Sequence, residues 1–358
     1  MVNDMLSCFQ RYHSGVTLLL FVSLFFSCSD REDSSTNRPF GIVLHGGGGV
    51  RSRKEMTHEL EEAYRSTLRE ALTAGYAILK DGGSSVAAVE ATIRAMEDSP
   101  LFNAGKGASF TNAGTNELDA SIMNGKTMRA GGVAAAQYVK NPITLARLVM
   151  EETPHVLLVD EGALTFAKEQ GVELRSADYF YTERKWKSLQ RRLKENVPYG
   201  GQLESAIEDT LLPENENDED KFGTVGAVAL DKAGNLAAGT STGGRVKKRP
   251  GRVGDSPIIG ASTYANNQTC AVSTTGLGEK HMVLLTSKEI SALMAHKGMS
   301  LKEAANDVIM NQLVEIGGGG GAIAIDSKGN IVMPFTGEGM YRGHIKSDGK
   351  IVVKIYRE

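Results

Sequence analysis

The stretch Phe222-Gly-Thr-Val-Gly-Ala-Val-Ala-Leu-Asp231 decides how this chain folds. Its short run of small and β-branched apolar residues is typical of a buried β-strand. Directly before it, Pro213-Glu-Asn-Glu-Asn-Asp-Glu-Asp-Lys221 is acidic and has no large apolar side chain, which predicts an exposed, mobile linker over 213–221. A linker that leads straight into a core strand makes sense if that strand becomes a new N-terminus at Thr224.

Thr224 would gain its chemistry from such a cut. Breaking the Gly223–Thr224 bond would give this residue a free α-amine beside its hydroxyl. An α-amine has a pKa of about 7.7–8.0 and can accept the hydroxyl proton, so that one residue serves as nucleophile and base. Gly223 has no Cβ and can adopt the strained geometry that an internal attack requires. If the neighbouring motifs are left aside, the alternative interpretation is that Thr224 merely begins a β-strand.

The composition is that of a globular enzyme. The chain has 358 residues, 41% of them hydrophobic and 23% charged, with a formal net charge of -3. This balance indicates no polyanionic partner. We interpret the basic run Arg245-Val-Lys-Lys-Arg249 as a solvated loop, so no nucleic acid is expected as a partner.

The N-terminus differs from the rest of the chain. After Arg11, residues 16–26 form an apolar run of the length of a signal-peptide core, followed by Cys28. We expect residues 1–28 to be a signal peptide of the lipoprotein type with a lipid anchor on Cys28, followed by a polar linker over 29–39. The protein would then be exported, as a periplasmic or membrane-anchored protein. Plain secretion and a misassigned start codon are the alternatives. Cys270 would remain a small buried hydrophobe without a disulfide.

Hydrophobic periodicity gives the expected elements. Strand patterns cover 40–44, 118–123, 132–139, 156–160, 222–231, 236–241, 271–275, 322–326, 331–334 and 351–356. Helical patterns cover 56–80, 85–98, 143–152, 161–169, 182–195, 288–296 and 301–316. Strands and helices grouped in each half favour an α+β fold of stacked sheets covered by helices.

An esterase of the α/β-hydrolase type is one alternative. Gly239-Thr-Ser-Thr-Gly243 matches the nucleophile elbow around Ser241, and Asp255 and His281 follow in the order that a catalytic triad requires. His45-Gly-Gly-Gly-Gly49 looks like an oxyanion loop. The elbow needs a helix directly after the turn, however, and the residues after Gly243 show no helical pattern. We keep the esterase only as a remote possibility.

Several long motifs resemble the plant-type asparaginase and isoaspartyl peptidase family. They are Phe222–Asp231, Gly234-Asn-Leu-Ala-Ala-Gly-Thr-Ser-Thr-Gly-Gly244, Pro250-Gly-Arg-Val-Gly-Asp-Ser-Pro257, Tyr264-Ala-Asn-Asn267, Ser273-Thr-Thr-Gly-Leu-Gly-Glu279, His45–Gly49, Pro100-Leu-Phe-Asn-Ala-Gly-Lys-Gly107 and Asn116-Glu-Leu-Asp-Ala-Ser121. The resemblance implies a four-layer αββα sandwich of the N-terminal nucleophile hydrolase type. It implies autocatalytic cleavage into an α chain (40–223) and a β chain (224–358), assembled as a dimer of αβ heterodimers. The expected reaction is hydrolysis of β-aspartyl dipeptides and L-asparagine to release L-aspartate.

The same resemblance implies roles for individual residues. Thr224 would be the nucleophile, with Thr242 beside it and Asn103 nearby, while the Thr275 hydroxyl and the Gly276 N–H would stabilise the oxyanion. Arg252 and Asp255 stand three apart in a glycine-bounded loop, where a guanidinium could bind a carboxylate and a carboxylate an ammonium. The family uses this pair, with Gly278, for the substrate's amino-acid group. A surface ion pair is the alternative for Arg252 and Asp255.

Four further expectations complete this interpretation. The resemblance implies a structural sodium held by the backbone carbonyls of Met96, Glu97, Ser99, Phe102, Ala104 and Lys106, and no catalytic cofactor. The seven histidines include no H-x-x-x-H pair, which favours the absence of zinc. Glycosylasparaginase is the nearest alternative, but those relatives carry Asp where Gly223 stands. Leu277 replaces a threonine common in the family and puts the fine specificity in doubt.

Overall fold

The computed structural model describes residues 38–50, 53–54, 56–194 and 223–357. The predicted signal peptide, lipid-anchor site and acidic linker lie outside these residues. Within them, no helix combines the length and the apolar character needed to cross a membrane.

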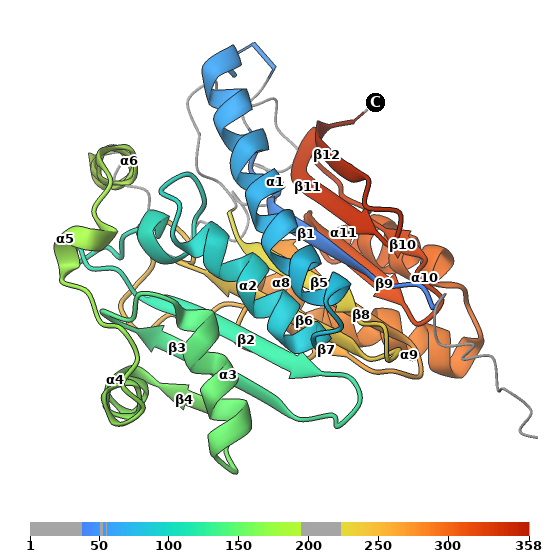
Figure 1. Ribbon diagram of the computed structural model, residues 1–358. Coiled ribbons are helices and arrows are strands. Elements are labelled where there is room, and N and C mark those ends of the chain that lie inside the picture. The colour runs from blue at the N-terminus through green and yellow to red at the C-terminus, as the bar shows by residue number, and fades with distance from the viewer. Residues whose placement is uncertain (1–37, 51–52, 55, 195–222, 358) are drawn as a thin grey trace, which may run out of the picture. The chain divides into compact units, whose positions relative to one another are not determined.

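A large sheet forms the centre of the fold (Figure 1). Its strands are β1 (Gly41–Gly47), β2 (Leu118–Asn124), β3 (Ala130–Ala136), β4 (Leu157–Val159), β5 (Val225–Leu230), β6 (Leu236–Thr242), β11 (Gly339–Lys346) and β12 (Ile351–Tyr356). Their order is β12-β11-β1-β5-β6-β2-β3-β4, and only the β3–β4 pair is parallel. The strand that follows Thr224 is therefore central, with Gly226 paired to His45 on one side and to Thr240 on the other.

A smaller antiparallel sheet packs on one face of the large one. It consists of β7 (Thr263–Ala265), β8 (Cys270–Gly276), β9 (Gly320–Asp326) and β10 (Ile331–Val332), in the order β10-β9-β8-β7. Apolar side chains such as Val43, Val228 and Leu230 meet Ile323 and Ile325 between the sheets. Burial of this layer removes apolar surface from water, which stabilises the pairing of the two sheets.

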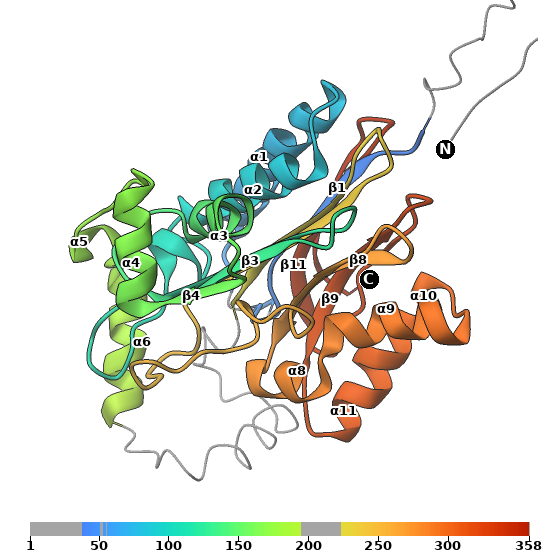
Figure 2. The ribbon, with the colours of Figure 1, turned by 90° about the horizontal axis from the view of Figure 1, so that it is seen from below.

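Helices cover both outer faces (Figure 2). Helices α1 (His58–Lys80), α2 (Ser85–Glu97) and α3 (Pro142–Glu152) pack on the large sheet. Helices α9 (Thr286–Lys297) and α10 (Leu301–Asp307), the π-turn η3 (Val308–Gln312) and α11 (Leu313–Glu315) pack on the small one. The four-layer αββα sandwich is thus confirmed. The other helices in the described residues are η2 (Gly105–Gly107), α4 (Asp160–Glu169), α5 (Ala177–Phe180), α6 (Glu183–Lys194) and α8 (Gly278–Leu284).

The pleat of β5 sorts its side chains between two cores. Val225, Ala227 and Ala229 join the core under α1 and α2, whereas Val228 and Leu230 join the core between the sheets. Successive side chains on a strand point to opposite faces, so a strand buried on both faces reads as a continuous apolar run. This is why the 222–231 segment could be predicted from its sequence.

Strand β11 was not predicted, because its sequence contains charged residues that are not typical of a buried strand. It contains Arg342, whose buried guanidinium donates to the carbonyl oxygens of Met340, Ile355 and Tyr356. These bonds satisfy a cation that would otherwise be costly to bury. The predicted helix over 301–316 is also interrupted, since η3 separates α10 from α11.

Candidate active site

Thr224 lies at the start of the central strand, directly before β5. Its side chain is 7% exposed, and its hydroxyl donates to Thr242 Oγ1 at 3.2 Å. Thr242 ends β6, and its oxygen also accepts from the Gly244 N–H at 3.1 Å. The structure thus brings together the two threonines that the sequence predicted as neighbours.

The carbonyl oxygen of Gly223 is held by two donors. Asn103 Nδ2 donates to it at 2.7 Å, and Thr242 Oγ1 donates to it at 3.1 Å. Asn103 is itself anchored, because its Oδ1 accepts from the Ser109 N–H at 2.8 Å and its Nδ2 also donates to Gly244 O at 2.7 Å. Two fixed donors on one carbonyl polarise it and can stabilise the negative charge that develops on attack.

The predicted oxyanion donors lie on the facing sheet. Thr275 and Gly276 end β8, which packs against β5 through the inter-sheet layer. The Thr275 hydroxyl is fully buried, with no hydrogen-bond partner among the described residues. A buried hydroxyl without a hydrogen-bond partner is uncommon in folded proteins, and such a group is available to donate to a bound ligand.

Arg252, Asp255 and Gly278 converge, as predicted. A Cβ atom at Gly278 would lie 2.7 Å from Asp255 Oδ1 and 3.0 Å from Arg252 Nη2, so only glycine leaves this space open. Burial raises the pKa of Asp255, while the nearby His281 and Arg252 oppose this shift. A bound ammonium group would place a positive charge beside Asp255 and so favour the ionised form of this buried carboxylate.

Glu279 was missed by the sequence reasoning, although it directly follows Gly278. Its Oε1 accepts from Arg252 Nε at 3.0 Å and from Arg252 Nη2 at 2.8 Å. Burial alone would raise the pKa of Glu279, but the attraction and hydrogen bonds of Arg252 keep it below its ordinary value. Glu279 therefore fixes the orientation of the Arg252 guanidinium. Three of the five N–H groups of that guanidinium do not bond the Glu279 carboxylate.

Two buried histidines also border the site and were not predicted as part of it. His45 Nε2 lies 3.0 Å from Ser273 Oγ, and His281 Nδ1 lies 3.0 Å from Thr286 Oγ1. Burial lowers the pKa of His45 to about 3 and lowers that of His281 as well. Both imidazoles are therefore neutral near pH 7. The signals in the sequence were the motif His45–Gly49 and the place of His281 after Ser241 and Asp255 in the order of a triad.

The esterase hypothesis fails on geometry. Ser241 is fully buried, and its hydroxyl donates to Glu97 Oε1 of α2 at 2.6 Å. On the same strand, Thr240 bonds Ser273 of the small sheet. Ser241 therefore points to the helix side of the large sheet, away from the layer that holds His281 and Asp255. A nucleophile elbow would need these groups on one side.

The interpretation of 245–249 as a solvated loop was partly wrong. The run is a loop, but Lys248 is 3% exposed, and its ammonium donates to Glu117 O at 2.9 Å. Burial lowers the pKa of Lys248, against the attraction of Asp119 and Glu117. A sequence pattern could not show this, because burial of one lysine depends on which segments close over it.

The predicted sodium loop lies where α2 ends. Its carbonyls crowd around two glycines: a Cβ at Gly107 would lie 2.8 Å from Pro100 O, and one at Gly105 would lie 2.9 Å from the Glu97 carbonyl carbon. Met96 O and Ala104 O accept from backbone amides at 3.2 and 3.1 Å. Backbone carbonyl oxygens are ligands that suit a hard cation such as sodium. No group of three His, Cys, Asp or Glu side chains in the described part of the chain is arranged to hold a metal.

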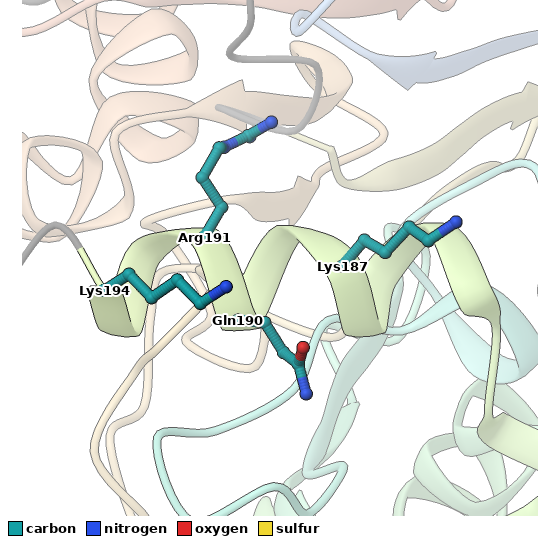
Figure 3. Close-up of a pocket in the computed structure, with 4 residues that line it drawn as sticks. All are labelled: Lys187, Gln190, Arg191 and Lys194. Atoms are coloured by element: carbon teal, nitrogen blue, oxygen red, sulfur yellow. The ribbon is translucent and has the colours of Figure 1, made fainter.

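A separate surface pocket lies on α6 (Figure 3). Its lining residues Lys187, Gln190, Arg191 and Lys194 all come from this helix. None of them was predicted as a site residue, and none lies on β5, β6 or β8. This pocket is therefore not the candidate site, which lies at the ends of β5, β6 and β8.

Comparison with known proteins agrees with this geometry. The sequence model of a family described as asparaginase matches residues 38–355. The chain belongs to the asparaginase family. Among proteins of this family, it is 46% identical over 317 residues to an isoaspartyl peptidase of Salmonella typhimurium, covering 88% of this chain and 98% of that protein. It is 42% identical over 313 residues to a human isoaspartyl peptidase/L-asparaginase, covering 87% and 94%. An isoaspartyl peptidase of Escherichia coli is 45% identical over 317 residues, covering 88% and 96%.

Membership of the asparaginase family explains why the predicted motifs converge in space. The matched region contains every residue of the candidate site, from His45 to Glu279. None of the three relatives named above carries the name of the alternative, glycosylasparaginase.

Proposed function

We propose that this protein is an autoprocessing threonine hydrolase that cleaves β-aspartyl dipeptides and L-asparagine to release L-aspartate. The observation that carries the proposal is the relay at the Gly223–Thr224 bond. The Thr224 hydroxyl donates to Thr242, and the Thr242 hydroxyl donates to the carbonyl of the bond to be cut. The names of the relatives support the substrates.

The relay suggests how the chain cuts itself. Thr224 Oγ attacks the Gly223 carbonyl carbon while its proton moves to Thr242 Oγ1 and the Thr242 proton moves to the former carbonyl oxygen, which also accepts from Asn103. The C–N bond then breaks as this oxygen gives up the proton and the Thr224 nitrogen takes it up, and an ester joins Gly223 to Thr224 Oγ. Water hydrolyses this ester, leaving a carboxylate on Gly223 and a free α-amine and hydroxyl on Thr224.

The processed residue would then act on substrate. Asp255 would bind the α-ammonium and Arg252 the α-carboxylate of the aspartyl group, on either side of Gly278. The Thr224 α-amine accepts the hydroxyl proton as Oγ attacks the side-chain carbonyl, and it returns the proton to the leaving amine. Thr275 and the Gly276 N–H would stabilise the oxyanion. Water completes the cycle by hydrolysing the β-aspartyl ester on Thr224.

The test uses a chain of residues 38–358 and its Thr224→Ala variant. Intact masses should show two wild-type fragments, the lighter one beginning at Thr224, and one uncut chain for the variant. Release of aspartate from β-aspartyl dipeptides and from L-asparagine should accompany cleavage. A wild-type chain that stays whole and hydrolyses neither compound refutes the proposal, and the binding of β-aspartyl peptides without hydrolysis would indicate a binding protein instead.

We propose that two αβ heterodimers associate. Exposed apolar side chains support this: Val283 of α8 is 80% exposed, and Leu285, Met310 and Val314 lie exposed on α8, η3 and α11 or at their ends. Light scattering after gel filtration should give the mass of two αβ heterodimers. The Val283→Glu variant tests whether this surface forms the contact between them. A monomeric wild type would contradict the assembly.

We propose that the 96–106 loop binds a structural sodium through its carbonyls. The crowding of carbonyls around Gly105 and Gly107 supports this. Thermal unfolding in sodium, potassium and choline chloride at equal ionic strength should give the highest Tm in sodium. Equal Tm values in the three salts would refute the site.

We also propose that residues 1–28 direct export and that Cys28 carries a lipid. The support is the apolar run before Cys28 and the start of the family match at residue 38. Cells that express the full chain should yield a detergent-phase protein, and Cys28→Ala should move it to the aqueous phase. A full-length N-terminus in the purified protein would refute processing.

A further inference from the structure

A cluster of buried hydroxyl groups lies between the two sheets. Thr240 is its centre: its Oγ1 lies 2.7 Å from Ser273 Oγ and accepts from Thr263 Oγ1 at 2.7 Å. Ser273 lies 3.0 Å from His45 Nε2, and Ser121 Oγ lies 2.8 Å from Thr263 Oγ1. These five residues come from β6, β8, β7, β1 and β2, and all are fully buried.

This cluster lies one layer below the candidate active site. On a strand, side chains two residues apart point to the same face. Thr240 is two residues before Thr242, and Ser273 is two residues before Thr275. Gly226, two residues after Thr224, faces Ser273 and His45, because a Cβ there would overlap Ser273 Oγ and His45 Nε2.

The cluster also extends toward the residue expected to bind the substrate's ammonium. Ser262 lies 3.4 Å from Thr240, and its oxygen accepts from Thr274 Oγ1 at 3.0 Å. Thr274 lies 3.4 Å from Asp255 Oδ2. At the other end, Ser121 donates to the carbonyl of Ser256, the neighbour of Asp255, at 2.6 Å.

A chain of buried hydroxyl bonds sets distances more strictly than apolar packing does. Each bond has a preferred length and direction, and breaking one leaves a buried polar atom without a partner. Here the bonds join both sheets, so that they fix β1 and β6, the two neighbours of β5, relative to β8. An apolar layer at this place would fill the same volume without fixing these distances.

We propose that this cluster of His45, Ser121, Thr240, Thr263 and Ser273 positions the reacting groups, with Thr240 as its central positioning residue. It sets the separation of Thr224, Thr242 and Thr275, although none of its members touches substrate. The inference rests on the proposed function, because it takes these three threonines as the reacting groups. Burial keeps His45 neutral and its Nε2 bonds Ser273 Oγ, so that no charge develops next to the nucleophile.

Three variants of the 38–358 chain test the role. Thr240→Val removes the hydroxyl and keeps the shape, whereas Thr240→Ser keeps the hydroxyl. Thr269→Val is the matched control, because Thr269 makes a buried 2.7 Å hydroxyl bond to Ser291 at the far end of β8. We expect both valine variants to lose a similar few degrees of Tm, on the order of 2–4 °C for each kcal/mol lost.

Activity should separate these variants. For Thr240→Val, kcat on a β-aspartyl dipeptide should fall by about 10- to 100-fold, because small displacements of reacting groups have effects of this size. KM should stay within about threefold, because this variant keeps the direct contacts to substrate. Thr240→Ser should recover most of kcat, and Thr269→Val should keep all of it. If Thr240→Val and Thr269→Val have equal kcat, the role is merely structural and the inference is overturned.

A second measurement is made on wild type and does not depend on turnover. Nitrogen-15 spectra of histidine-labelled wild type, with His45 assigned by His45→Gln, should show one neutral tautomer from pH 5 to 8. Averaging between tautomers would overturn the inference. If wild type hydrolyses nothing but shows one fixed tautomer, the proposed function fails while the arrangement of the cluster stands.

Discussion

Removal of the Thr242 hydroxyl should block self-cleavage. Thr242→Val keeps the side-chain shape but deletes the oxygen that joins Thr224 Oγ1, Gly223 O and Gly244 N at 3.2, 3.1 and 3.1 Å. The scissile carbonyl then keeps only Asn103 as a described donor. Loss of one of two such donors costs about 2.7–4 kcal/mol in the transition state, a rate reduction of about 10²- to 10³-fold.

The assay follows newly made precursor over time. Cell-free synthesis with a short pulse of labelled amino acid defines the start, and intact masses give the uncut fraction for each variant. Thr242→Ser should cleave within about tenfold of wild type, because it restores the hydroxyl. Thr269→Val controls for the loss of a buried hydroxyl bond elsewhere. If Thr242→Val cleaves within about threefold of Thr269→Val, the relay has no part in the reaction and the reasoning is wrong.

Three further predictions concern substrate binding and stability. Gly278→Ala should nearly abolish dipeptide hydrolysis but leave self-cleavage intact, since its methyl group would lie 2.7 Å from Asp255 Oδ1; steady-state kinetics and intact masses report both. Arg252→Lys should raise KM by about 10- to 100-fold, because a lysine cannot form a two-pronged pair with a carboxylate; an unchanged KM would exclude this contact. Burial raises the pKa of Glu97 to about 8, so the folded state holds a proton that the unfolded state releases above about pH 4.5. Stability should therefore fall as pH rises from about 4.5 to 8, and Glu97→Gln should flatten this part of a Tm-against-pH curve; identical curves would contradict the assignment.

Predictions from sequence succeeded where the information is local. The apolar run after Thr224 predicted a buried strand, and β5 is the central strand of the large sheet. The periodic pattern over 85–98 predicted a helix, and α2 covers Ser85–Glu97, with the Ser84 side chain capping it by accepting from Ala87 N. Cys270 was expected to be a small buried residue and is fully buried. Each of these features depends on a few adjacent residues.

Predictions failed where a buried polar group depends on distant partners. Strand β11 was not predicted because the acceptors that allow Arg342 to be buried are backbone carbonyls of β12. Lys248 was expected in solvent, but Glu117, 131 positions away, supplies its acceptor. Patterns along a sequence carry no record of such pairings, since each partner looks like an ordinary polar residue.

The sequence by itself determined which residues could react and which segments form the layers. It placed Thr224 between an acidic run and a core strand, and its motifs predicted the four-layer sandwich. Only the tertiary structure decided that the side chains of the adjacent residues Ser241 and Thr242 lie on opposite faces of the large sheet. Ser241 bonds Glu97 under the helices, whereas Thr242 bonds the Gly223 carbonyl. The physical reason is that a pleated strand alternates its side chains, while the layers packed on each face determine what those side chains meet.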